Sequence, residues 1–391
     1  MEKARFKWVL RERNRKIAAK TEVFTEQQAR RVRSFHSSFK EYSPTPLIEL
    51  TSLAQHLGIK NLFVKDESYR FGLNAFKVLG GSFAIGSYIA NELGEDIDDL
   101  PYMRLVSDEV RSLLGSKTFI TTTDGNHGRG VAWTANRLKQ QAIVYMPQGS
   151  AAERLANIRA EGAQAEITDM NYDDTVRYTS ELAQKNGWII VQDTAWDGYT
   201  RIPLWIMQGY MTMALEAYEQ LPVKPTHIFL QAGVGSLAGS VQGFFADIYG
   251  SSCPLTFIVE PKGADCLYKT AAANDGSLHS VTGRLETIMA GLACGEPNSI
   301  AWEILGNLSD GFISCPDYTA AQGMRILGNP LAGDTKVNAG ESGAATVGLV
   351  AEAMRDERLS DLKQALQLDE NSVVLCLSLI HISEPTRQAE I

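Results

Sequence analysis

The sequence predicts an α/β protein of two domains, each with a sheet of mainly parallel strands between two layers of helices. Three observations support this prediction. Short β-rich segments alternate with segments of helical periodicity, which is the pattern of parallel sheets covered by helices. The 391 residues exceed the size of one typical domain, about 150 residues. The β-rich segments also fall into two groups, which the long helical stretch 205–220 separates.

The expected elements follow from residue types and spacing. Strands are assigned where Val, Ile, Thr and aromatic residues cluster, and helices where apolar residues recur at helical spacing. Gly162 and Gly187 favour helix ends, because glycine readily adopts the left-handed cap conformation. In chain order, the sequence predicts strand 61–65, helix 76–93, strand 118–122, a helix through about 138, strand 141–146, helix 152–161, strand 164–168, helix 173–184, strand 188–192, helix 205–220, strand 227–231, a glycine loop with a helix, and strand 255–260.

The order of these elements suggests which residues belong to each domain. We expect residues 1–92 and 205–391 to form a large domain and residues 93–204 a small one. The active site is expected in the cleft between them, where parallel sheets present their loops. Residues 379–391 form an atypical tail and are left out of the fold prediction.

Composition excludes several function classes. The formal net charge of −9 gives no basic surface for nucleic acid or for anionic membranes. No run reaches the roughly 18 apolar residues of a membrane-spanning helix, and the basic N-terminal segment lacks the apolar core of a signal peptide. The five cysteines are odd in number and contain no CxxC pair, so neither a metal site nor a disulfide framework is expected. These features predict a cytoplasmic protein.

Lys77 is the first candidate for chemistry. It lies at the start of helix 76–93, directly after a loop, and its neighbours Ala75, Phe76 and Val78 are apolar. Partial desolvation and the positive end of the helix dipole both favour the neutral amine, which is the nucleophilic form. The alternative is an ordinary surface lysine.

The second candidate is the segment between strand 118–122 and the next helix. Hydroxyl and backbone N–H groups at a helix N-terminus can form an anion site. Thr123, Asp124 and Gly125 are therefore candidate substrate-binding residues. Asp124 could instead cap the helix. For His127 in the same segment we favour a packed, hydrogen-bonded histidine.

The third candidate is a glycine loop that follows strand 227–231 and opens a helix. Gly233, Gly235 and Gly239 form the pattern GxGxxxG, which differs from the dinucleotide fingerprint GxGxxG and from the Walker loop. Glycines let the backbone fold round an oxyanion, and a helix N-terminus favours phosphate. The loop fits a single phosphate group, with contacts expected from Gly233, Val234, Gly235, Ser236 and Leu237.

These three segments, in this order, resemble the fold-type II pyridoxal-phosphate enzymes, the group of tryptophan synthase β and the serine/threonine dehydratases. The resemblance covers roughly residues 35–376 and includes three lead-in segments, 45–47, 64–68 and 259–261. Within the group, four further segments are similar to the diaminopropionate ammonia-lyases: 72–77, 123–128, 290–296 and 339–343.

The resemblance implies roles for particular residues. Lys77 would bind pyridoxal 5'-phosphate covalently, and the glycine loop would hold the cofactor phosphate. Asn126 would contact the ring hydroxyl, and Ser378 matches the position beside the ring nitrogen. Asp193 is a further catalytic candidate by family match, with a surface or capping aspartate as the alternative. The resemblance also implies a homodimer.

Asp124 indicates the leaving group. Serine-type dehydratases of this group expel hydroxyl and usually carry a serine where this chain has Asp124. An amine leaves poorly unless it is protonated, and a carboxylate can hold a β-ammonium group. The expected reaction is elimination from D- or L-2,3-diaminopropionate, giving pyruvate and ammonia. The alternatives are a serine/threonine dehydratase or threonine synthase-like lyase, and an inactive binding protein with the same fold.

Overall fold

The chain folds into two compact units. The computed structural model describes residues 6–12, 21–123 and 125–379. The larger unit consists of the described parts of residues 1–26, 44–69 and 213–391, and the smaller unit of those of 27–43 and 70–212. Among the described residues, strands form a sheet of seven in the larger unit and a sheet of four in the smaller unit. Residues 380–391 of the predicted tail lie outside the described residues.

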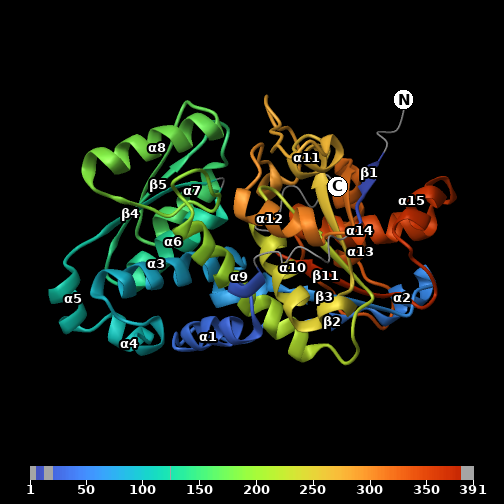
Figure 1. The fold of residues 1–391 in the computed structure, drawn as a ribbon, viewed down its shortest axis with the longest axis horizontal. Coiled ribbons are helices and arrows are strands. Elements are labelled where there is room, and N and C mark those ends of the chain that lie inside the picture. Colours follow the sequence, from blue (N-terminus) through green and yellow to red (C-terminus); the bar gives the residue numbers. More distant parts are fainter. Residues whose placement is uncertain (1–5, 13–20, 124, 380–391) are drawn as a thin grey trace. The chain divides into compact units, whose positions relative to one another are not determined.

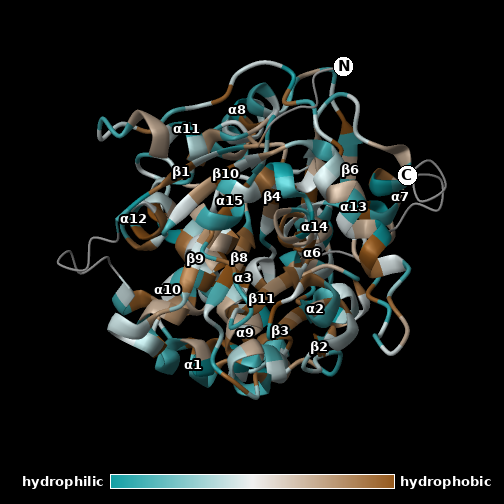
Figure 2. Cartoon of the chain, turned by 90° about the vertical axis from the view of Figure 1, so that its right-hand side faces the viewer, coloured by the Kyte–Doolittle hydropathy of each residue, from teal (hydrophilic) through white to brown (hydrophobic). Residues whose placement is uncertain are grey.

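The larger sheet has the order β1-β10-β9-β8-β11-β3-β2. Its inner neighbours pair in parallel, whereas β1 and β2 pair antiparallel at the two edges. The strands β8, β9 and β11 consist mostly of hydrophobic residues, which appear brown in Figure 2. The bounds are β1 Lys7–Leu10, β2 Leu47–Glu49, β3 Asn61–Asp66, β8 His227–Gln231, β9 Leu255–Pro261, β10 Gly311–Cys315 and β11 Val373–Ser378.

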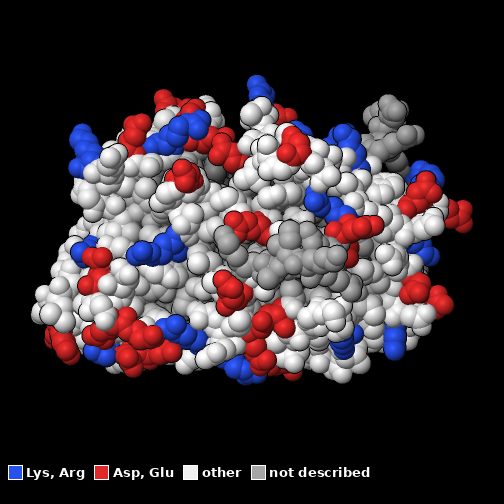
Figure 3. Space-filling view, viewed as in Figure 1, with Lys and Arg blue, Asp and Glu red and all other residues white. Residues whose placement is uncertain are grey.

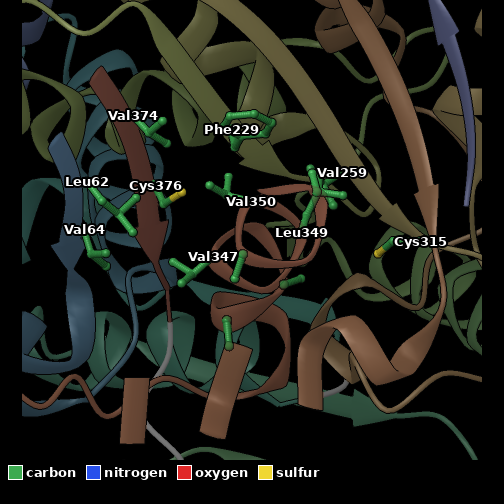
Figure 4. Packing of buried hydrophobic residues seen from close by; sticks show 14 of the residues in the cluster. Leu62, Val64, Phe229, Val259, Cys315, Val347, Leu349, Val350, Val374 and Cys376 are labelled. Carbon is green, nitrogen blue, oxygen red and sulfur yellow. The ribbon is translucent and has the colours of Figure 1, made fainter. Parts of the chain in front are cut away.

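Helices cover both faces of the larger sheet. Successive strand residues point to opposite faces. On β3, Val64 joins the hydrophobic core that includes Val347 of α14 (Figure 4), whereas Lys65 bonds to Glu216 of α9. The helices α14 and α9 therefore lie on opposite faces. The helices of this unit are α2 Thr51–Leu57, α10 Ser236–Tyr249, α11 Cys266–Ala273, α12 Ser299–Leu308, α13 Asp317–Gly328, α14 Glu341–Arg355 and α15 Ser360–Ala365, and α9 Arg201–Gln220 crosses the boundary between the units.

The smaller sheet is parallel throughout, with the order β6-β5-β4-β7. Phe119 of β4 packs against Tyr88 of α3, with 5.7 Å between ring centroids, while Thr122 of β4 bonds to Thr179 of α8 on the opposite face (Figure 1). This unit therefore also has three layers. Its elements are α1 Glu26–Ser37, α3 Lys77–Leu93, α4 Tyr102–Leu105, α5 Asp108–Leu114, β4 Thr118–Thr122, α6 Asn126–Arg137, β5 Gln141–Met146, α7 Ala152–Ala160, β6 Gln164–Ile167, α8 Tyr172–Asn186 and β7 Ile189–Ile190.

The α/β class and the mainly parallel sheets agree with the prediction, but residues 27–43, 70–92 and 205–212 fall in a different unit from the predicted one. The predicted boundaries assigned these three segments to the large domain, whereas in the structure they cluster with the smaller unit. Close helix packing explains this for α3, since a Cβ atom on Gly130 of α6 would lie only 2.9 Å from the Cα of Val78. A glycine at this point allows the two helices to pack backbone to backbone.

The surface and the helices add two observations. On the face shown in Figure 3, lysines and arginines are interspersed with aspartates and glutamates. Within the described residues, none of the helices combines the length and the apolar character that a membrane span requires.

Candidate active site

Lys77 and Asp193 form a direct contact in the smaller unit. Lys77 is the first residue of α3, as predicted, and its ammonium group donates a hydrogen bond to Asp193 Oδ2. The side chains are 17% and 10% exposed, so the ion pair is largely shielded from water. A carboxylate partner favours the ammonium form of lysine. The contact therefore opposes the two effects that predicted a neutral amine from the position of Lys77 alone.

Asp193 remains a carboxylate at neutral pH. Burial alone would raise the pKa of its side chain, but the charge of Lys77 and the imidazole of His127 lower the pKa to about 2. His127 Nδ1 lies 4.0 Å from Asp193 Oδ2, and its Nε2 lies 2.7 Å from the carbonyl oxygen of Val191. His127 is packed and hydrogen-bonded, as expected. Asp193 can hold a cation, and its burial excludes the alternative of a surface aspartate.

Two residues fix the backbone that carries Asp193. The Tyr199 hydroxyl accepts a hydrogen bond from the Gln192 N–H at 2.8 Å and donates one to the Ile190 carbonyl at 3.0 Å. The Gln192 amide bonds to the N–H and the carbonyl of Thr122 at 3.0 and 3.1 Å. The backbone N–H of Gln192 therefore bonds to a side chain and not to a neighbouring strand. The strand β7, Ile189–Ile190, is accordingly shorter than the predicted strand 188–192. Burial raises the pKa of the Tyr199 phenol, which keeps it a neutral donor.

The loop before α6 contains the predicted substrate-binding residues. The Thr123 hydroxyl is buried and accepts a hydrogen bond from the Gly125 N–H at 2.9 Å. Gly125 is the N-cap of α6, with φ of 155°, and the half-buried Asn126 opens the helix. Asp124 lies outside the described residues.

The glycine loop of the larger unit connects β8 to α10, as predicted. Gly235 is the N-cap of α10 with φ of 101°, a conformation that favours glycine. A Cβ atom there would lie 3.2 Å from the side chain of Leu305. At Gly233 a Cβ atom would lie 3.3 Å from Cys294 Sγ and from the Leu292 Cα. The loop is thus a narrow backbone turn at a helix N-terminus, where N–H groups lack intrahelical partners.

Ser378 lies at the same edge of the sheet as this loop. It is the last residue of β11, which runs parallel to β8, and the Gln231 amide at the end of β8 donates a hydrogen bond to the Leu377 carbonyl at 2.7 Å. The Ser378 side chain is fully buried, and its Oγ has no hydrogen-bond partner among the described residues. A buried hydroxyl of this kind suits a polar ligand atom. The larger unit therefore fits a cofactor with a phosphate and a ring nitrogen.

Comparison with known proteins identifies the family. The family model described as "Pyridoxal-phosphate dependent enzyme" matches residues 39–378. The chain belongs to the pyridoxal-phosphate dependent enzymes. Membership in this family confirms both the predicted cofactor and the fold.

Within this family, the chain is similar to diaminopropionate ammonia-lyases, as its motifs predicted. The enzyme of that name from Salmonella typhimurium is 52% identical over 89% of this chain and 87% of its own length. Two crystal structures of the Escherichia coli enzyme, the holo form and a complex with an aminoacrylate-PLP azomethine reaction intermediate, are each 46% identical. Their TM-scores are 0.90 and 0.89, and each match covers 99% of this chain and 96% of the other.

The sequence did not predict three residues that hold the backbone or side chains of candidate site residues in place. Gln192, Tyr199 and Asn298 belong to no motif. Their hydrogen-bond partners are backbone groups and the hydroxyls of Thr121, Tyr172 and Ser236. Gln192 directly precedes Asp193, a predicted site residue, and this adjacency is the only feature of the sequence that points to Gln192. No such feature points to Tyr199 or Asn298.

Proposed function

We propose that this chain eliminates the β-amino group of 2,3-diaminopropionate, in its D and L forms, and with one water yields pyruvate and two molecules of ammonia. The observation that carries the proposal is the shielded contact between Lys77 at the head of α3 and the ionised Asp193. The resemblance to diaminopropionate ammonia-lyases supports the same substrate.

The proposed cofactor contacts follow from the residues in each unit. Lys77 binds the cofactor aldehyde carbon, and Asn126, in the first turn of α6, contacts the ring hydroxyl. Residues 233–237 hold the phosphate, and the Ser378 hydroxyl meets the ring nitrogen. Bound pyridoxal phosphate supplies an electron sink for the electron pair left at the substrate Cα.

The proposed substrate contacts come from the loop before α6 and from Asp193. Thr123, Asp124 and Gly125 bind the substrate, and Asp124 holds its β-ammonium group. Asp193, with a pKa of about 2, does not donate a proton near neutral pH. Its role is to hold a positive charge, either on Lys77 or on the substrate.

A paired assay tests this function. Ammonia release is measured with 2,3-diaminopropionate and with serine, using the purified protein loaded with pyridoxal phosphate. We expect kcat/KM to favour diaminopropionate by at least about tenfold. A preference for serine or threonine would support the dehydratase alternative instead. Cofactor binding without turnover of either substrate would support the inactive binding protein.

Gly235→Val tests the phosphate loop. The positive φ of Gly235 and the 3.2 Å approach of Leu305 leave no room for a branched side chain. We expect the dissociation constant for pyridoxal phosphate to rise more than about tenfold, which corresponds to about 1.4 kcal/mol. The measurement is a cofactor titration of the cofactor-free protein.

Gly187→Val is the matched control for this substitution. Gly187 caps α8 with φ of 69°, and a Cβ atom there would meet nothing within 4 Å. It introduces similar backbone strain away from the loop, so cofactor affinity should stay unchanged. A folded Gly235→Val protein with unaltered cofactor affinity would refute the assignment of the phosphate loop.

The resemblance also supports two inferences about assembly and location. We infer a homodimer and a cytoplasmic protein whose partner is a small amino acid, and neither nucleic acid nor membrane.

A further inference from the structure

A buried asparagine holds the glycine loop of the larger unit. Asn298, which is fully buried, lies 62 residues after Ser236 in the chain. Its side-chain Nδ2 donates a hydrogen bond to Ser236 Oγ at 2.8 Å. Its backbone N–H donates a second hydrogen bond to the Val234 carbonyl at 2.8 Å. One residue therefore holds two positions of the loop, one by its side chain and one by its backbone.

The orientation of the Asn298 amide follows from its other contacts. Its Oδ1 accepts hydrogen bonds from the N–H groups of Ile300 and Ala301, at 2.9 and 3.2 Å, and so caps α12. Only the amide oxygen can accept from an N–H group, so Nδ2 must face Ser236. The Ser236 oxygen is consequently the acceptor in its contact with Asn298. Its own hydrogen is therefore directed away from Asn298 Nδ2, since a hydroxyl has one donor and two acceptor positions.

Ser236 is the first residue of α10, where N–H groups and the helix dipole favour an anion. We propose that Asn298 is a positioning residue for the cofactor phosphate, which orients the Ser236 hydroxyl as a donor to a phosphate oxygen. The inference rests on the proposed function, because it takes residues 233–237 as the phosphate site. Hydrogen bonds to a charged acceptor are about twice as strong as neutral ones, so this orientation matters for affinity.

Asn298→Ser separates the two contacts of the side chain. Serine is a good N-cap, so α12 keeps its cap, but its short side chain loses the amide donor that faces Ser236. Dissociation constants are measured for pyridoxal phosphate and for pyridoxal, which lacks the phosphate, by titrating the cofactor-free protein. We expect the constant for pyridoxal phosphate to rise about tenfold and that for pyridoxal to change by less than about twofold. Equal changes for both compounds, or no change, would overturn the proposal.

Asn298→Asp gives a second variant of nearly the same size. Its carboxylate still caps α12 but accepts a hydrogen bond from Ser236 instead of donating one. The hydroxyl then turns away from the phosphate, and the added negative charge opposes the anion. We expect a larger loss of pyridoxal phosphate affinity than with Asn298→Ser, again with pyridoxal little affected. Retained affinity in this folded variant would also overturn the proposal.

A double-mutant cycle tests whether Asn298 acts through Ser236. In a Ser236→Ala background, Asn298→Ser should cause no further loss of pyridoxal phosphate affinity, because the contact is already absent. Additive losses would show that Asn298 acts by another route. Asn171→Ser is the matched control, since Asn171 caps α8 through a 2.9 Å hydrogen bond from the Asp174 N–H. It should leave both dissociation constants unchanged.

Failure of this inference is distinguishable from failure of the proposed function. If the unmodified protein prefers pyridoxal phosphate to pyridoxal and releases ammonia from diaminopropionate, unchanged Asn298 variants overturn the positioning role alone. If the unmodified protein shows no preference for the phosphorylated compound, the phosphate site itself is wrong, and the inference falls with it.

Discussion

Asp124→Asn is expected to lower kcat/KM for D-2,3-diaminopropionate by about 10² or more and that for the L-isomer by much less. If their amino and carboxylate groups are held in the same place, the two enantiomers would present their Cα protons to opposite sides of the site. We propose that Lys77 removes the proton from the L-isomer and Asp124 that from the D-isomer. Asparagine preserves the shape of the side chain but cannot take a proton. The measurement is kcat/KM for both isomers in the unmodified and substituted proteins.

The two isomers act as internal controls for each other in this experiment. Asp173→Asn adds a matched variant, because Asp173 lies in the first turn of α8 in the same unit and should leave both rates unchanged. Equal losses on the two isomers would show that Asp124 is not a stereospecific base. Unchanged rates on both would return Asp124 to a structural role.

Lys77→Ala is expected to lower kcat/KM for both isomers by about 10³ or more, because the substitution removes the covalent attachment point and a proton acceptor together. Lys77→Arg distinguishes this role from the ion pair. Arginine can keep a positive charge beside Asp193, but a guanidinium that stays protonated cannot act as a nucleophile. Both substitutions should therefore abolish turnover, whereas only Lys77→Ala leaves Asp193 without a cationic neighbour on α3.

Lys117→Ala is the matched control for the lysine substitutions. Lys117 is in the same unit and pairs with Glu92 at 3.4 Å on a more exposed part of the surface. Its removal should leave kcat/KM unchanged. Substantial turnover by Lys77→Arg would contradict the attachment role, since the ion pair alone would then explain the importance of the position.

Local pattern was sufficient for several of the parallel strands and for the positions of the motifs, but the parallel strand β10 was not predicted. The strands at 118–122, 141–146 and 227–231 have the predicted bounds, because buried parallel strands read as short apolar, β-branched runs between turn residues. Lys77 and Gly235 lie at helix starts as predicted, because glycine and loop signals mark these positions locally. The edge strands β1 and β2 were not predicted, since they are short and pair antiparallel.

The structural features that the local sequence pattern did not predict depend on tertiary contacts. Nothing near Asp193 indicates that its partner is Lys77, which lies 116 residues earlier. The shortening of β7 depends on Tyr199 and on Thr122, which come from a loop and from another strand. The assignment of α3 to the smaller unit depends on a glycine contact with α6. Each of these facts arises only when distant segments pack together.

Lys77 is expected to carry the cofactor, and a labelling experiment tests this attachment directly. Sodium borohydride reduces the link between the cofactor aldehyde carbon and its lysine to a stable amine, and peptide mapping then locates the pyridoxyl group. We predict a label on Lys77. A label on another lysine would contradict the account, for example on Lys65, which is fully buried and bonded to Glu216 at 2.9 Å.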